Sequence, residues 1–241
     1  MSTVDPKDRL IVALDAPTLE VAEQWLIELK GVVHYYKVGL ELFTAHSWKA
    51  VNLVKNYGGK VFLDLKLHDI PNTVSRTLAS VCEHEVDLVN VHALGGFEMM
   101  KAAREAVDKY SSGRVIKPKL IAVTILTSHS QETLKKDLCI KKNVKDEVIH
   151  LAGLAQKAGL DGVVCSPQET AWVRKKCGKD FVIVTPGVRP VGAALGDQKR
   201  IETPEKAIKS GASYIVVGRP ITQAENPKKT ALEILSSIAS S

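Results

Sequence analysis

Short apolar runs alternate with longer amphipathic stretches along the whole chain, at a spacing of roughly 25 to 30 residues. The runs have the length and composition of buried β-strands, and the stretches between them carry apolar residues at helical spacing. The predicted strands are 9–15, 35–40, 60–66, 87–93, 119–126, 162–167, 181–187 and 214–220. The clearest predicted helices are 18–30, 74–86, 97–110 and 144–159. The pattern therefore predicts eight β–α units in sequence.

Capping residues occur where these helices should begin and end. Residues 166–169 read Ser-Pro-Gln-Glu, a capping box with proline at the first helical position, and Thr203-Pro204 and Asn226-Pro227 predict two further helix starts. Glycines at the expected helix ends are Gly31, Gly58, Gly113, Gly159, Gly178 and Gly211. Eight units without a break in composition predict one α/β domain over 1–241. We expect a (β/α)8 TIM barrel, because a doubly wound sheet usually has about five to seven strands.

Composition fits a soluble globular protein, with 45% hydrophobic and 25% charged residues among 241. Apolar stretches such as 120–123 are far shorter than the ~18 residues of a membrane span, and the N-terminus has no apolar signal-peptide core. We therefore expect a cytoplasmic protein that does not contact a membrane. The four cysteines form no Cys-x-x-Cys pair, so we interpret them as reduced packing residues.

The net charge of +6 is compatible with a nucleic-acid partner, with a small anionic substrate, or with solubility alone. Aromatic residues make up only 5% of the chain, which argues against a surface that stacks on bases. The densest basic run, 135–145, contains no aromatic residue and alternates with apolar and acidic positions. We interpret it as a solvated helical face rather than a nucleic-acid patch, and expect no nucleic-acid partner.

Charged residues occur where the first three predicted strands end, at the edge where barrels of this class carry their chemistry. The residues are Asp15, Lys37, Asp64 and Lys66, and the fourth strand adds Asn90 and His92. Period-2 alternation places Asp64 and Lys66 on one face of their strand, pointing inward. The charges could simply pair inside the barrel, but buried ion pairs are weak evidence for stability, so we favour a functional role. His92 is interpreted as a hydrogen-bonded core histidine, and no histidine shows metal-ligand spacing.

A second polar cluster follows the last two predicted strands, where barrels often bind phosphate. Residues 185–189 read Thr-Pro-Gly-Val-Arg, and strand eight ends in Gly218-Arg219. Glycine lets backbone N–H groups approach an anion, and an arginine can bind one bidentately. The loop that follows Arg189 exceeds the usual connection of about 2–6 residues, so a lid that closes over a ligand is favoured over a passive connector.

The segment 64–73, Asp-Leu-Lys-Leu-His-Asp-Ile-Pro-Asn-Thr, contains the pattern Asp64-x-Lys66-x-x-Asp69. It closely resembles the catalytic segment of the orotidine 5′-phosphate decarboxylase family. The family's other motifs follow in its order and spacing: Asp15 in 12–16, Lys37 in 36–39, Thr127 in 123–128, then 185–189, Gln198 and 217–220. The resemblance covers strand one to strand eight and is to the stand-alone bacterial form, with no fused orotate phosphoribosyltransferase domain.

The resemblance implies cofactor-free and metal-free removal of CO2 from C6 of orotidine 5′-monophosphate, which gives uridine 5′-monophosphate in pyrimidine synthesis. Lys66 would stabilise the carbanion at C6 and then protonate it. Asp64 and Asp69 would favour the charged ammonium of that lysine. Lys37 would pair with Asp64 and the ribose, and Asp15 would contact the ribose.

The remaining expected contacts come from the same resemblance. Asp69, Ile70 and Thr73 would enter the active site of a partner subunit, which implies a homodimer. Thr127 would recognise the pyrimidine edge and Gln198 would bridge base and phosphate. The other substrate-binding residues implied are Pro186, Arg189, Gly218 and Arg219, with Gly218 and Arg219 holding the phosphate and Arg189 closing over it.

Two alternatives remain open from the sequence. A related phosphate-binding barrel uses a similar Asp-x-Lys-x-x-Asp segment with Mg²⁺ and acts on sugar phosphates through an enediolate, and its activity would vanish on chelation. A non-catalytic nucleotide-binding barrel would bind uridine 5′-monophosphate without decarboxylation. Residues 68–73, Thr127, Gln198 and Arg219 favour the nucleotide decarboxylase over both.

Overall fold

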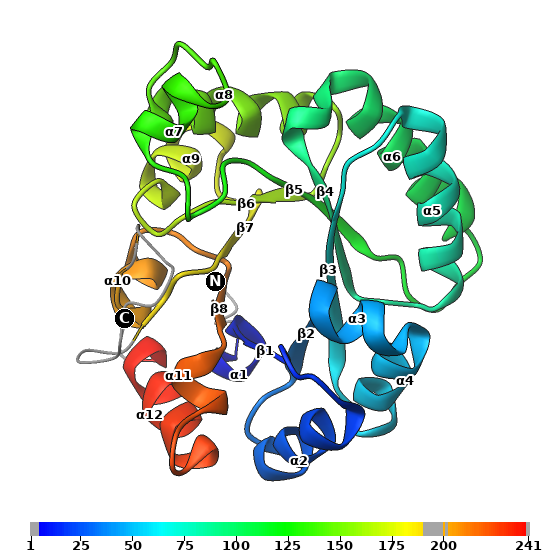
Figure 1. Ribbon diagram of the computed structural model, residues 1–241, viewed down its shortest axis with the longest axis vertical. Coiled ribbons are helices and arrows are strands. Elements are labelled where there is room, and N and C mark those ends of the chain that lie inside the picture. The colour runs from blue at the N-terminus through cyan, green and yellow to red at the C-terminus, as the bar shows by residue number, and fades with distance from the viewer. Residues whose placement is uncertain (1–4, 190–199, 201, 240–241) are drawn as a thin grey trace.

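The computed structural model describes residues 5–189, 200 and 202–239, which form a closed barrel of eight parallel strands. The strands follow one another around the barrel in chain order, and the last pairs with the first (Figure 1). They are β1 Leu10–Ala13, β2 Tyr35–Gly39, β3 Lys60–Leu67, β4 Leu88–His92, β5 Lys119–Val123, β6 Gly162–Val164, β7 Val182–Thr185 and β8 Tyr214–Val217. The predicted (β/α)8 barrel is confirmed.

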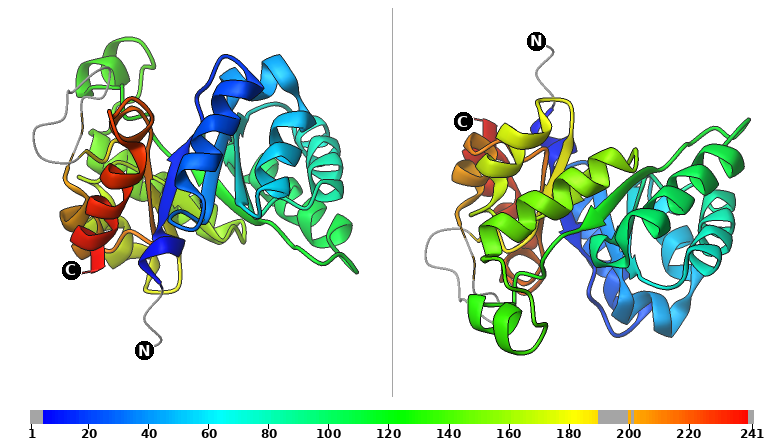
Figure 2. Two further views of the ribbon diagram at one scale, coloured as in Figure 1. Left: turned by 90° about the horizontal axis from the view of Figure 1, so that it is seen from below. Right: turned by 90° about the horizontal axis from the view of Figure 1, so that it is seen from above.

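Helices cover the outside of this ring of strands, except for the short α1 at one end of the barrel (Figure 1). They are α1 Pro6–Arg9, α2 Leu19–Leu29, α3 Leu40–His46, α4 Trp48–Asn56, α5 Pro71–Glu83, α6 Gly96–Tyr110, α7 Gln131–Lys136, α8 Val144–Lys157, α9 Thr170–Cys177, α10 Pro204–Lys209, α11 Arg219–Thr222 and α12 Pro227–Ala239, with a 3₁₀ turn η1 at Ala93–Gly95. Figure 2 shows α1 and α7 at opposite ends of the barrel. Since α1 precedes β1, the end marked by α7 is the one where the strands finish.

The capping box at 166–169 forms, but it does not begin a helix at Pro167 as the sequence predicted. Glu169 Oε2 accepts from the backbone N–H of Ser166 at 2.9 Å, and Ser166 Oγ accepts from the N–H of Gln168 at 3.3 Å. Residues 167–169 are a turn, and α9 begins at Thr170. The backbone N–H of Glu169 donates to the carbonyl of Ser166, three residues back, at 3.1 Å, which closes a tight turn before the α-helix begins. The two Xaa-Pro starts are confirmed, since α10 begins at Pro204 and α12 at Pro227.

The interior of the barrel is apolar in its lower part and polar at the mouth. Side chains inside the lower barrel form a separate buried cluster of Ile11, Ala13, Tyr35, Phe62, Leu88, Ile121, Val184 and Val216. Two residues further along β2, β3 and β4, the same inward-facing row continues as Lys37, Asp64 and Asn90. Side chains alternate between the two faces of a strand, so every second residue faces inward. The inward-facing polar residues therefore follow the inward-facing apolar residues on the same strands, nearer to the mouth of the barrel.

The outward faces of the strands pack against the helices in a second, larger cluster that includes Val12, Val38, Leu63, Val89 and Ala122. Within the described part of the chain, no helix is long and apolar enough to cross a membrane. The outward faces of the strands thus form the main hydrophobic core, between the sheet and the helices.

Two smaller predictions are corrected by the structure. Cys82, Cys165 and Cys177 are buried free thiols, as expected for packing residues, but Cys139 is exposed. The basic run 135–145 is not one helical face, because α7 ends at Lys136 and α8 begins only at Val144. Residues 137–143 separate the two helices, and Asn143 is the N-cap of α8, where its side chain accepts from the N–H of Asp146 at 2.8 Å.

Candidate active site

A cavity of about 310 Å³ opens at the end of the barrel where the strands finish. Its floor is formed by inward-facing apolar residues such as Phe62, Val184 and Val216, and its walls by the residues that follow the strands. The predicted site residues that line it are Asp15, Lys37, Asp64, Lys66, Thr127, Pro186, Arg189, Gly218 and Arg219. The fold therefore gathers residues as far apart in the sequence as Asp15 and Arg219 into one site.

Four charged side chains of alternating sign form a row along one wall of this cavity. Lys37 Nζ lies 2.8 Å from Asp15 Oδ1 and 3.4 Å from Asp64 Oδ2. The other oxygen of Asp64, Oδ1, lies 2.8 Å from Lys66 Nζ. The side chains of Lys37 and Asp64 are each only 11% exposed, whereas that of Lys66 is 33% exposed and faces the cavity. The most accessible cation of the row is thus the one at its end.

Mutual attraction keeps the buried members of the row charged. Burial opposes the ammonium of Lys37, but the carboxylates of Asp64 and Asp15 outweigh it and raise its pKa above the ordinary value. Burial likewise opposes the carboxylate of Asp64, but Lys37 and Lys66, with a hydrogen bond from Asn90, outweigh it and lower its pKa. At neutral pH Asp64 is therefore a fixed negative charge beside the lysine that faces the cavity.

Asn90 of β4 fixes the geometry of both ends of the Asp64–Lys66 pair. Its amide Nδ2 donates to Asp64 Oδ1 at 2.6 Å, and its Oδ1 accepts from the backbone N–H of Lys66 at 2.8 Å. The backbone of Lys66 has a φ of +52°, and the β3–β4 register shifts between Leu63 and Leu67. A left-handed conformation is unfavourable for lysine, so the fully buried Asn90 helps to hold a strained residue in place.

Gly39, the last residue of β2, leaves room for this row of charges. A Cβ on Gly39 would lie 2.6 Å from Lys37 Nζ and 3.0 Å from Asp15 Oδ1. Real Cβ atoms do not approach other atoms so closely, and Lys37 is held by two carboxylates. A side chain at position 39 would therefore displace the Lys37 ammonium.

The wall formed by β7 and β8 carries the second cluster. Arg189 is buried and Arg219 is exposed, and both line the cavity together with Pro186 and Gly218. The backbone N–H of Arg189 donates to the carbonyl of Glu202 at 3.0 Å, so the two ends of the loop after β7 are joined. Two guanidinium groups beside a glycine are suited to binding a phosphate. Gln198 and the expected lid segment lie outside the described residues.

Three predicted site residues do not line the cavity of this chain. Asp69, Ile70 and Thr73 are exposed where β3 leads into α5, and the side chain of Ile70 is a large apolar group left 67% exposed. The carboxylate Oδ1 of Asp69 accepts from the backbone N–H of Ile70 at 2.7 Å. Within one chain, therefore, Lys66 has Asp64 as its neighbouring carboxylate and not Asp69.

His92 at the end of β4 is hydrogen-bonded, as predicted, but it is half-buried and not a core residue. Its Nδ1 accepts from the N–H of Leu94 at 3.3 Å, and its ring stacks on His68 with centroids 5.4 Å apart. Burial, together with the nearby His68 and Lys66, lowers the pKa of His92 to about 4. At neutral pH it adds no charge to the site.

Functional residues that the sequence did not assign include Asn90, which it noted only as a polar strand end. The available signal was its position two residues after the inward-facing Leu88, just as Lys37 follows Tyr35 and Asp64 follows Phe62. Among the described residues, no group of three or more His, Cys, Asp or Glu side chains is arranged to hold a metal ion.

These features define the class of protein: a (β/α)8-barrel enzyme whose cavity is lined by a row of paired lysines and carboxylates and by two arginines. The chain matches the model of the orotidine 5′-phosphate decarboxylase / HUMPS family over residues 8–234. It belongs to this family and is a carboxy-lyase.

Similar proteins support this assignment over nearly the whole chain. Orotidine 5′-phosphate decarboxylase of Geobacter metallireducens is 49% identical over 238 residues, which are 99% of both chains. The enzyme of the same name from Moorella thermoacetica is 47% identical over 239 residues, which are 99% of this chain and 95% of the relative. The crystal structure of orotidine 5′-phosphate decarboxylase from Lactobacillus acidophilus matches with a TM-score of 0.85 at 38% identity, covering 96% of this chain and 99% of that one.

Proposed function

We propose that this protein converts orotidine 5′-monophosphate to uridine 5′-monophosphate and CO2 in pyrimidine synthesis, with Lys66 as the catalytic acid and with no metal or organic cofactor. The observation that carries the proposal is the position of Lys66. Its ammonium lies at the open end of a row of paired charges, in a cavity that is also lined by two arginines and a glycine. A nucleotide bound by its phosphate at Arg219 would extend its base toward this ammonium.

The chemistry explains why a cation is needed there. Breaking the C6–carboxylate bond releases CO2 and leaves the electron pair on C6, in the plane of the ring, where the π-system cannot take it up directly. An ammonium beside C6 stabilises that charge and then transfers a proton to C6, which completes the replacement of CO2 by H. Lys66 then regains a proton from solvent.

Asp64 and Lys37 have supporting roles in this scheme. Asp64 holds the Lys66 ammonium at 2.8 Å, and its fixed negative charge would face the carboxylate that leaves as CO2. Lys37 keeps Asp64 ionised and would share the ribose hydroxyls with Asp15. Loss of CO2 relieves the repulsion between the two carboxylates, which favours the forward reaction.

Phosphate binding must contribute to the rate as well as to affinity. Enzymes lower barriers by about 8–23 kcal/mol, whereas one electrostatic group typically supplies about 2.7–4 kcal/mol. Lys66 alone is therefore insufficient. Contacts of Arg189, Gly218 and Arg219 with the phosphate, together with contacts of Gln198 and Thr127 with the base, would hold C6 against Lys66.

The proposal includes a homodimer in which Asp69 completes the site of the partner subunit. In a single chain Asp69 lies outside the cavity, and Ile70 exposes apolar surface at the same rim. Burying this segment, including Thr73, against a second copy would cover Ile70 and bring a second carboxylate toward Lys66.

The decisive experiment follows the absorbance of orotidine 5′-monophosphate with purified protein in excess EDTA. Wild-type protein should decarboxylate the substrate in EDTA. Lys66→Ala should lose at least about 10³-fold in kcat, because it loses both an electrostatic contribution and the catalytic acid. The surface control Lys101→Ala should match wild type. Folded wild-type protein without turnover, or turnover that EDTA abolishes, would refute the proposal. Turnover of sugar phosphates with added Mg²⁺ would then identify the metal-dependent barrel.

The shared site is tested by mixing two inactive variants. Lys66→Ala and Asp69→Ala homodimers should each be inactive, and their mixture should regain activity, because some mixed dimers contain one site with both wild-type residues. A monomer in sedimentation velocity, or no regain after subunit exchange is shown, would contradict the shared site.

A further inference from the structure

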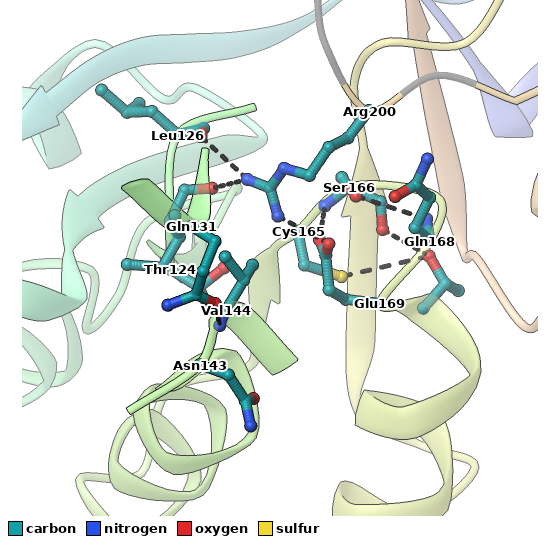
Figure 3. A network of polar contacts seen from close by, with 12 residues as sticks. Thr124, Leu126, Gln131, Asn143, Val144, Cys165, Ser166, Gln168, Glu169 and Arg200 are labelled. Carbon is teal, nitrogen blue, oxygen red and sulfur yellow. Dashed lines mark hydrogen bonds and ion pairs between the residues drawn. The ribbon is translucent and has the colours of Figure 1, made fainter. Parts of the chain in front are cut away.

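One buried arginine, Arg200, joins three of the loops that surround the cavity (Figure 3). Its Nη1 lies 2.5 Å from Glu169 Oε1, in the loop after β6. Its Nη2 donates to the carbonyl of Leu126 at 2.8 Å and to that of Ile125 at 3.2 Å, in the loop after β5. Arg200 itself belongs to the loop after β7. No element of the catalytic scheme uses this side chain.

The carbonyl of Leu126 has a second role in the wall of the cavity. It also accepts from the backbone N–H of His129 at 2.9 Å, which closes a turn around Thr127 and Ser128. Thr127 and Ser128 both line the cavity, as do Ile125 and Leu126. Arg200 therefore donates to the carbonyl on which the turn that carries Thr127 is closed.

The ion pair between Arg200 and Glu169 is buried, and both side chains are held by further hydrogen bonds. The side chains of Arg200 and Glu169 are 10% and 2% exposed, so their charges are screened little by solvent. The second oxygen of Glu169 is occupied by the N–H of Ser166 at 2.9 Å, which fixes the carboxylate on its own loop. A planar guanidinium with several donors can satisfy one carboxylate and two carbonyls at once, which a lysine ammonium does less well.

We propose that Arg200 is a positioning residue that holds the segment 125–128 in place, and that through it Arg200 sets the affinity for the base of a bound nucleotide rather than for its phosphate. The inference rests on the proposed function, because it takes Thr127 as the residue that reads the pyrimidine edge. Gly218 and Arg219, the residues proposed to hold the phosphate, follow β8, and the side chain of Arg200 makes none of the contacts described above to them.

The test compares two ligands that share a ribose phosphate and differ in the base. Titration calorimetry with uridine 5′-monophosphate and with ribose 5-phosphate gives the dissociation constants for wild type and Arg200→Met. We expect the variant to bind uridine 5′-monophosphate at least tenfold more weakly and ribose 5-phosphate within threefold of wild type. The KM for orotidine 5′-monophosphate should rise together with the dissociation constant for uridine 5′-monophosphate.

A second variant removes the unpaired carboxylate that Arg200→Met leaves behind. Glu169 would be a buried, uncompensated charge in the single variant, which is strongly destabilising. The double variant Arg200→Met/Glu169→Gln should regain thermal stability, yet it should keep the weakened binding of uridine 5′-monophosphate because the carbonyls of Ile125 and Leu126 still lack their donor. Binding that returns to wild-type strength in the double variant would overturn the proposal.

Arg174, a half-buried arginine that also binds backbone carbonyls, provides a control for the loss of such hydrogen bonds away from the cavity. Its guanidinium donates to the carbonyls of Gly178, Phe181 and Gly211, and it does not line the cavity. Arg174→Met should lower the melting temperature and leave KM and both dissociation constants unchanged.

The remaining outcomes separate the inference from the proposed function. Equal weakening of both ligands by Arg200→Met would assign Arg200 to the phosphate and overturn the inference. An unchanged KM with only a lower melting temperature, as for Arg174→Met, would make Arg200 purely structural and also overturn it. Wild-type protein that neither binds uridine 5′-monophosphate nor decarboxylates its precursor would instead refute the proposed function.

Discussion

Replacing Asn90 with alanine tests whether the position of Lys66 is imposed from the neighbouring strand. The variant removes the hydrogen bond from Nδ2 to Asp64 and the hydrogen bond from the backbone N–H of Lys66 to Oδ1. Lys66 would then lose the cross-strand acceptor that holds its backbone at a φ of +52°. We expect the backbone to relax toward an extended conformation, which moves the ammonium away from its place in the cavity.

The expected magnitudes follow from the contacts that are lost. The hydrogen bond to the charged Asp64 contributes about 1.5–3 kcal/mol and the backbone hydrogen bond about 0.5–1.5 kcal/mol. Relief of left-handed strain at Lys66 returns about 1–2 kcal/mol, so the net loss of stability should be about 1–3 kcal/mol. Misplacing a reacting group by about 1 Å can cost about 10²-fold in rate, so kcat should fall much more than stability alone suggests.

Asp87 supplies the matched control at the other end of the same two strands. Its Oδ2 accepts from the backbone N–H of Val61 at 2.7 Å, so Asp87→Ala also removes a side-chain contact from the β4 segment to the backbone of β3. We expect both variants to lose stability in urea unfolding. Only Asn90→Ala should lose about 30–100-fold in kcat, in proportion to the displacement of Lys66.

The assay is single-turnover decarboxylation with the enzyme in saturating excess over the substrate, compared with steady-state kcat, so that the chemical step is separated from product release. A kcat for Asn90→Ala within threefold of wild type would refute the reasoning, because Lys66 would then hold its position without the strand beside it. Equal losses of kcat in Asn90→Ala and Asp87→Ala would refute it as well, since general loosening of the β3–β4 pair would explain both.

Three further predictions concern other parts of the site. The pKa of His92 falls from 6.5 to about 4 in the folded state, so the unfolded chain binds a proton there more readily, and the stability should decline as pH falls from 6.5 toward 4. In urea unfolding, His92→Gln should show a shallower decline of stability over this pH range. Parallel profiles for the variant and wild type would contradict this prediction. Gly39→Ala should displace Lys37 and lower kcat/KM at least tenfold, whereas the helical control Gly153→Ala should gain about 0.5–1 kcal/mol of stability with unchanged kcat/KM. Arg219→Ala should lower kcat/KM at least 10²-fold although it is remote from C6, and an unchanged value would remove phosphate binding from the mechanism.

The barrel and the charged row could be predicted from sequence because both follow from local periodicity. Strands that alternate faces place Asp64 and Lys66 on one side, and parallel strands finish at one end of the barrel, so the charges meet there. Their individual partners were not predictable in the same way. Local alternation gives no sign that Lys66 adopts a left-handed backbone, because the acceptor that holds it is 24 residues away on the next strand.

The network around Arg200 could not be predicted because its members are joined only by the tertiary fold. Glu169 was correctly read as part of a capping box, but its pairing with an arginine 31 residues later depends on how two loops meet. The carbonyls that Arg200 binds carry no sequence signal, since every residue has one. Asp69 differs, because it is expected to act in the site of a partner subunit. A single chain leaves it exposed, so neither its local sequence nor its contacts within the chain indicate that role.

The layering of the barrel interior separates what makes the protein fold from what makes it react. The apolar layer of Tyr35, Phe62 and Leu88 lies one step below Lys37, Asp64 and Asn90 on the same three strands. Joint replacement of the paired charges in the upper layer by packed apolar side chains should therefore cost little stability, whereas removal of one partner alone is costly. For such a barrel, new chemistry could evolve by changing one ring of residues while the ring beneath it continues to specify the structure.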